Sequence, residues 1–112
     1  MKESYEGIGH LAVTVRANAC QAGQVCKFNT QGYVEKCSAG DVFCGVVEAV
    51  DRGYAAMQVE GFVTLPYTGT APGCGLKTLA ANGTGGIQVN ANGKEFLVVA
   101  VDAAKSQATI KL

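Results

Sequence analysis

Apolar and polar residues alternate along most of this chain with the period of a β-strand. In residues 11–16, Leu11, Val13 and Val15 fall on one face, because successive side chains of a strand point to opposite sides. Similar short patterns predict strands at residues 24–28, 33–37, 42–50, 54–65, 76–79, 87–89, 95–101 and 107–112. Helical spacing is interrupted by glycine wherever it begins. The pattern predicts an all-β fold, a single compact β-barrel or β-sandwich.

Glycine-rich turns separate the predicted strands, and the order of elements repeats. The chain has 15 glycines and two prolines, which is typical of tight turns and not of a disordered linker. Residues 51–53 predict a hairpin turn, and Gly61 predicts a bulge or bend within residues 54–65. Residues 47–51 (VEAVD) align with residues 98–102 (VVAVD) at a constant offset. The same offset places Ala55, Met57 and Val59 on Ser106, Ala108 and Ile110.

Charge gives no indication of nucleic-acid or membrane binding. Nine basic residues balance nine acidic ones and are spread along the chain, whereas binding to phosphates requires a concentrated positive face. No apolar run reaches the roughly 18 residues of a membrane span. Residues 1–9 are polar and unlike a signal peptide. We therefore expect synthesis in the cytoplasm, with neither nucleic acid nor membrane as a partner.

The sequence offers no convincing catalytic residues. His10 is the one histidine, and a triad-type site would also need a nucleophile and an orienting carboxylate within reach. Glu48 and Asp51 are expected on an exposed strand face and in a turn. The glycine-rich residues 83–86 lack the Lys-Ser/Thr and the helix of a phosphate loop. We expect no enzyme activity, no catalytic residue and no cofactor.

Five cysteines occur at positions 20, 26, 37, 44 and 74. Their number is odd, and no two have the C-x-x-C spacing. We expect reduced thiols that pack as small apolar side chains, and we assign no metal ligand. A zinc site formed by Cys20, Cys26, Cys37 and Cys44 is the alternative, although the close ligand pairs of structural zinc sites are missing. A disulfide is a further alternative.

The first 16 residues differ from the rest, and we treat residues 1–16 as an N-terminal arm and first strand. Residues 17–112 are then the β-barrel or β-sandwich domain. Such a segment can add a strand to a neighbouring chain. It can equally be an ordinary first strand preceded by a frayed leader. Both interpretations stay open at this point.

Several motifs resemble those of small tailed-phage capsid proteins. Residues 40–50 (GDVFCGVVEAV) resemble a GD-x-F-x-GVV strand, which leads through a hairpin to residues 56–66 (AMQVEGFVTLP). Residues 22–25 (AGQV) resemble an upstream AGD-x-V element. Residues 95–99 and 108–112 resemble the last hairpin of these families. The arrangement is similar to the lambda-type head decoration protein, more in pattern than in identity.

This resemblance implies a decoration protein that binds the outer surface of an expanded phage or prophage head and cross-links its capsomers. It implies a homotrimer whose N-terminal arm contacts the major capsid protein, and no catalytic residues. The exposed loop at residues 67–74 is a second candidate for contact. The predicted contact residues are Tyr5, Ile8, Leu11, Val13, Val15 and Tyr67.

Two other functions remain open from the sequence. One is a phage tail or baseplate structural module, which would share the β architecture but bind another part of the virion. The other is a small ligand-binding or metal-binding β-barrel that uses its cysteines.

Overall fold

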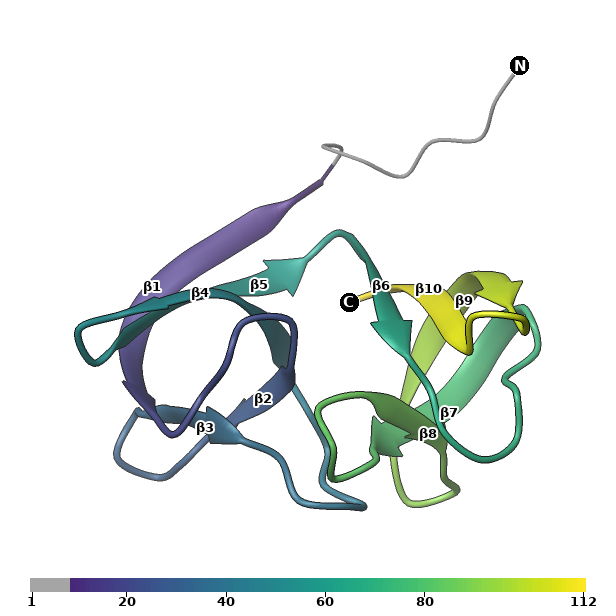
Figure 1. The fold of residues 1–112 in the computed structure, drawn as a ribbon, viewed down its shortest axis with the longest axis horizontal. Helices are drawn as coiled ribbons and strands as arrows, with labels where there is room; N and C mark the ends of the chain where they lie inside the picture. The colour runs from purple at the N-terminus through teal and green to yellow at the C-terminus, as the bar shows by residue number, and fades with distance from the viewer. Residues whose placement is uncertain (1–8) are drawn as a thin grey trace.

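The computed structural model describes residues 9–112, and the prediction of an all-β fold is confirmed. Ten strands follow one another without a helix between residues 9 and 112 (Figure 1). The first five are β1 (Leu11–Asn18), β2 (Val25–Phe28), β3 (Val34–Lys36), β4 (Gly45–Asp51) and β5 (Tyr54–Glu60). The second five are β6 (Phe62–Pro66), β7 (Gly75–Ala81), β8 (Ile87–Val89), β9 (Lys94–Asp102) and β10 (Gln107–Lys111).

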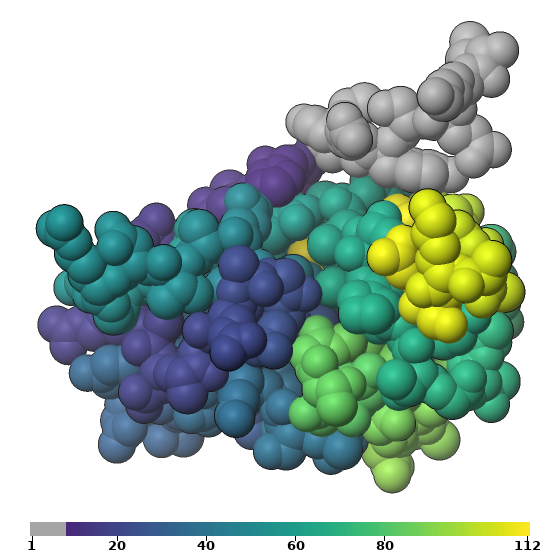
Figure 2. Space-filling model, in the orientation of Figure 1, coloured from purple at the N-terminus to yellow at the C-terminus, as the bar shows by residue number. Residues whose placement is uncertain are grey.

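The strands form two units that lie side by side. In the N-terminal unit, β1–β5 close into a barrel with the strand order β1-β3-β2-β4-β5. In the C-terminal unit, β6–β10 form a five-stranded sheet with the order β6-β10-β9-β7-β8. The two units occupy opposite halves of the molecule in Figures 1 and 2.

The C-terminal unit repeats the strand pairing of the N-terminal unit. The order of β6-β10-β9-β7-β8 is that of β1-β5-β4-β2-β3, strand for strand. The parallel pairing of β1 with β3 at Ala17 and Val34 has its counterpart in a single parallel bridge between Tyr67 and Ile87. The order of elements that repeats in the sequence therefore corresponds to a repeated topology.

The two long hairpins agree residue by residue. In β4–β5 the register shifts at Glu48, between Val47 and Ala49. In β9–β10 it shifts at Val99, the residue aligned with Glu48. The turns differ, because residues 52–53 join the first hairpin and residues 103–106 the second. Ala55 and Met57 therefore correspond to Ala108 and Ile110, two positions later than the constant offset predicted.

The two short hairpins share the same asparagine-centred turn. In the first, the Asn29 side-chain oxygen accepts hydrogen bonds from the backbone N–H groups of Gln31 and Tyr33, both at 3.0 Å. In the second, the Asn82 oxygen accepts from Thr84 at 2.8 Å and from Gly86 at 3.1 Å. Asparagine favours such turns because its side chain replaces a backbone acceptor.

Each unit has its own interior, and corresponding positions fill the two interiors. The inner core of the barrel consists of five buried residues. When the two units are aligned by their strand register, each of these residues corresponds to a buried residue of the C-terminal unit. The pairs are Cys26 and Leu79, Val34 and Ile87, Val47 and Val98, Ala55 and Ala108, and Met57 and Ile110.

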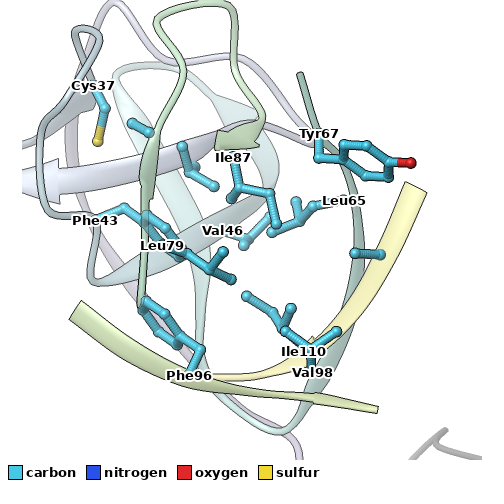
Figure 3. Packing of buried hydrophobic residues seen from close by; sticks show 13 residues of the cluster. Cys37, Phe43, Val46, Leu65, Tyr67, Leu79, Ile87, Phe96, Val98 and Ile110 are labelled. Atoms are coloured by element: carbon cyan, nitrogen blue, oxygen red, sulfur yellow. The ribbon is translucent and has the colours of Figure 1, made fainter. Parts of the chain in front are cut away.

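The interior of the C-terminal unit is completed by side chains from the other unit. Val25, Cys37, Phe43 and Val46 of the N-terminal unit belong to the same buried cluster as Leu79, Ile87 and Ile110, which we call the shared core (Figure 3). Phe43 stacks on Phe96 with ring centroids 4.7 Å apart and planes 3° from parallel. Because one core belongs to both units, they form one domain.

Main-chain hydrogen bonds hold the loop that carries Phe43 against the C-terminal unit. The Gly40 N–H donates to the Ala81 carbonyl, and the Ala81 N–H donates to the Asp41 carbonyl, both at 2.9 Å. The Asp41 carboxylate accepts from Lys27 Nζ at 2.6 Å and from the Ser38 N–H at 2.8 Å. The hydrogen bond from Lys27 holds the pKa of Asp41 below its usual range, helped by that from Ser38.

Most predicted strand boundaries agree with the structure to within a few residues. The long strand predicted at residues 54–65 is two strands, because the chain bends at Gly61. Gly61 has a φ of +103°, and a Cβ there would lie 3.0 Å from the His10 Cα. The predicted boundary between residues 16 and 17 falls inside β1, which continues to Asn18.

Replacing Phe43 with Ala should lower the free energy of unfolding by about 3–5 kcal/mol, because the change leaves a cavity beneath Phe96. Val42→Ala is the matched control. Val42 is the residue before Phe43 and its side chain is exposed, so this substitution should change the free energy of unfolding by roughly 0.5 kcal/mol or less. Urea denaturation followed by circular dichroism measures both. The wild type should unfold in one transition, whereas two separate transitions would contradict a core shared by both units.

The stabilising effect of the Lys27–Asp41 pair should depend on pH. Because the pKa of Asp41 is lower in the folded protein than in the unfolded chain, its carboxylate adds to the free energy of unfolding at pH values above the unfolded pKa. This contribution is lost as the pH falls through the folded pKa. The hydrogen bond to Asp41 raises the pKa of Lys27, so that contribution is lost only as pH rises through the raised value. Lys27→Met should therefore destabilise the protein between about pH 4 and pH 10, and its effect should diminish as the pH falls further.

Urea denaturation of the wild type and the Lys27→Met variant at pH 7 and pH 2 measures that difference. The exposed Lys36→Met is the control, since Lys36 makes no ion pair among residues 9–112. An effect of Lys27→Met that is the same at both pH values would show that the lysine acts only through its packing.

Candidate partner-binding surface

The predicted contact residues of β1 lie on a strand that is unusually exposed. Leu11 is 49% exposed and Val13 is 37% exposed, while Val15 is half-buried against the inner core of the barrel. In the C-terminal unit, Val63 and Leu65 occupy the positions of Val13 and Val15 and are less exposed. Tyr5 and Ile8 lie outside the residues that the structure describes.

One long edge of β1 has no partner strand within residues 9–112. On one side, residues 11–16 pair with β5. On the other side, β3 reaches β1 only at Ala17 and Asn18. An apolar edge of this kind is a template for a strand from another chain. β1 is thus an ordinary first strand of its own barrel, and it also has an edge to which a strand of a neighbouring chain could be added.

The start of β1 is fixed by contacts that the sequence did not predict. His10 Nε2 lies 2.6 Å from Glu48 Oε1, and both side chains are exposed. Glu48 is the residue at the register shift of β4, which places it out of line with its neighbours. The buried Gln58 donates from Nε2 to the carbonyls of Glu60 at 3.1 Å and Phe62 at 3.2 Å. The histidine contact joins the residue before β1 to β4, and the glutamine hydrogen bonds hold the bend at Gly61, which lies close to His10.

Tyr67 does not lie on an exposed loop. It is 8% exposed and belongs to the shared core, and its ring lies at the margin of that cluster with the hydroxyl pointing outward (Figure 3). Its N–H donates to the Ser106 carbonyl at 2.9 Å. The structure therefore gives Tyr67 a role in packing, and the exposed part of that loop begins at Thr68.

A shallow apolar depression of about 370 Å³ lies on the outer face of β1, β5 and β4. Small side chains form its floor, and Tyr54, Asp51 and Arg52 lie at the hairpin end. No motif indicated it, because it results from small residues that the register brings together across three strands. Its remaining lining residues are Thr14, Ala49, Ala55 and Ala56.

The cysteines are all free thiols. Cys26 and Cys37 are buried, Cys20 is half-buried, and Cys44 and Cys74 are exposed. Burial raises the pKa of the Cys37 thiol to about 12 and raises that of Cys26 further. Between residues 9 and 112, no three His, Cys, Asp or Glu side chains are grouped so that they could hold a metal ion.

Comparisons with known proteins leave the chain without an assigned family. No family model, no curated protein and no solved structure matches it. Within the described residues there is no helix with the length and apolar character of a membrane span. The surfaces described above are therefore the basis for a functional proposal.

Thiol labelling should follow the order of exposure. We expect Cys74 to react with a disulfide reagent at pH 8 well before Cys26 and Cys37, which should react only when the protein unfolds, because the thiolate is the reactive form. Peptide mass spectrometry at successive times identifies the labelled residue. Rapid labelling of Cys26 in the folded protein would contradict its place in the inner core.

Proposed function

We propose that this chain is a non-catalytic decoration protein that binds the outer surface of a phage or prophage head and stabilises it. It is made in the host cytoplasm, assembles as a homotrimer and cross-links neighbouring capsomers on the virion. The observation that carries the proposal is the apolar, exposed start of β1, one edge of which has no partner strand within residues 9–112.

The motif that resembles phage capsid proteins has a physical explanation in this fold. Asp41 anchors the loop of residues 38–44 through Lys27, and Phe43 fills the shared core. At Gly45 a Cβ would lie 2.6 Å from the Gln58 carbonyl oxygen, so a larger residue would force β4 away from β5. Val46 enters the shared core and Val47 the inner core. The resemblance therefore concerns residues that determine architecture, which supports a structural function.

Multivalency explains how modest contacts can suffice for this function. Each free edge and its flanking apolar side chains form a small surface, but several such surfaces on one assembly bind neighbouring capsomers together, which raises the effective affinity. Main-chain hydrogen bonds to an added strand would supply affinity, and the side chains of Leu11 and Val13 would supply specificity.

Co-sedimentation with expanded, undecorated heads of the major capsid protein encoded with this chain tests the proposal. The wild type should sediment with the heads. Removal of residues 1–8, or Leu11→Ser together with Val13→Ser, should weaken binding about tenfold or more. Val89→Ser is the matched control, because Val89 is similarly exposed but lies on β8.

Urea denaturation should show that removal of residues 1–8 leaves the free energy of unfolding unchanged, because β1 stays complete. Absence of binding by the wild type would overturn the proposal. Binding to purified tails or baseplates in place of heads would favour a tail module instead.

A further inference from the structure

Two leucines form an exposed pair on the outer face of the C-terminal unit. Leu76 of β7 lies directly opposite Leu97 of β9. Leu76 is 63% exposed, the largest value among the exposed large apolar residues between positions 9 and 112, and Leu97 is 37% exposed. Lys111 of β10 is the next neighbour across the sheet from Leu97 and is exposed.

The corresponding pair in the N-terminal unit is buried. The register of the two long hairpins aligns Val46 with Leu97 and Gln58 with Lys111. Val25 pairs with Val46, as Leu76 pairs with Leu97. Counted from the short hairpins, Val25 aligns instead with Thr78, because β7 has two more residues than β2 between this pair and the turn. Val25 and Val46 are covered because they enter the shared core with the C-terminal unit. This position of the fold is therefore an interface within the chain in one unit and an uncovered apolar surface in the other.

The depression on the N-terminal unit is apolar, whereas the equivalent surface of the C-terminal unit carries polar side chains. Thr14 pairs with Ala56 there, whereas the corresponding Thr64 and Thr109 hydroxyls of the C-terminal unit are hydrogen-bonded at 2.8 Å. Tyr54 corresponds to Gln107. The outer face at this position is therefore apolar and hollowed in the N-terminal unit and carries polar side chains in the C-terminal unit.

We propose that copies of this chain bind head to tail, with Leu76 and Leu97 of one copy packed in the depression of the next. The β4–β5 hairpin beside the depression and the strands β7 and β9 lie at opposite ends of the molecule's longest dimension, 39 Å (Figure 1). Each copy can therefore use both surfaces at once. This contact rests on the proposed self-association but is independent of capsid binding.

Charge and chemistry favour a second copy as the occupant. Lys111 flanks the leucines, and the exposed Asp51 lies at the depression. Among residues 9–112, the only ion pair of Asp51 is a 3.8 Å contact with Arg52, which is also exposed. Opposite charges at the rim of an apolar contact favour the correct orientation. Because the two surfaces differ, the contact is heterologous. It forms the homotrimer where the rotation between successive copies closes after three, and an open chain of copies where it does not.

Sedimentation velocity of two complementary variants tests this contact. Leu76→Gln with Leu97→Gln removes the leucine pair and leaves the depression intact. Ala49→Arg fills the depression and leaves the leucines intact. Each variant alone should associate about tenfold or more weakly than the wild type. An equimolar mixture should form a one-to-one dimer that grows no further, because each dimer retains only one pair of intact surfaces.

Val89→Gln and Val89→Arg are the matched controls for the two kinds of substitution, because Val89 is exposed and lies in neither surface. Both should associate like the wild type, and circular dichroism confirms that each variant is folded. A wild type that stays monomeric at all concentrations would overturn both the contact and the homotrimer, but not capsid binding. Variants that associate as strongly as the wild type would overturn the contact alone. A mixture that forms no dimer, although the wild type associates, would show that the contact joins like surfaces.

Discussion

The C-terminal unit depends on side chains that it does not itself provide. Its sheet is closed across β6 and β8 only by the bridge between Tyr67 and Ile87, and Phe43, Val46 and Val25 from the other unit complete its interior. Burial of apolar surface is the main favourable term in folding, so this contact determines how the halves are joined. The anchoring of residues 38–44 and the bend at Gly61 both serve to keep that contact in place.

Two copies of one topology have different surroundings, and their side chains differ accordingly. The N-terminal unit closes around a small inner core in which Cys26 and Ala55 take part. The C-terminal unit has Leu79 and Phe96 in its interior and remains open to receive Phe43. Outside the cores, one unit presents a leucine pair and the other an apolar depression. The proposed contact between copies uses these two surfaces, at which the equivalent positions of the two units differ.

The sequence predicted local structure well and long-range arrangement less well. Alternation in residues 11–16 and the Val-rich residues 42–50 identified strands correctly, because side-chain period is a local property. The repeat was visible in residues 47–51 and 98–102, but the difference in turn length hid the equivalence of Met57 and Ile110. Tyr67 looked exposed because turn residues follow it, whereas its burial depends on β8 and β10. The depression and the leucine pair arise from strand register, which depends on turn geometry as well as on the hydrophobic pattern.

The division of the shared core between the units has a consequence for synthesis on the ribosome. The N-terminal barrel has its inner core and all of its strands within the first sixty residues, so it can close as soon as that segment emerges. Phe43 and Val46 are then already displayed as a template when β6–β10 are translated. Synthesis proceeds from the N-terminus, so the residues that complete the C-terminal interior are translated before the strands that need them.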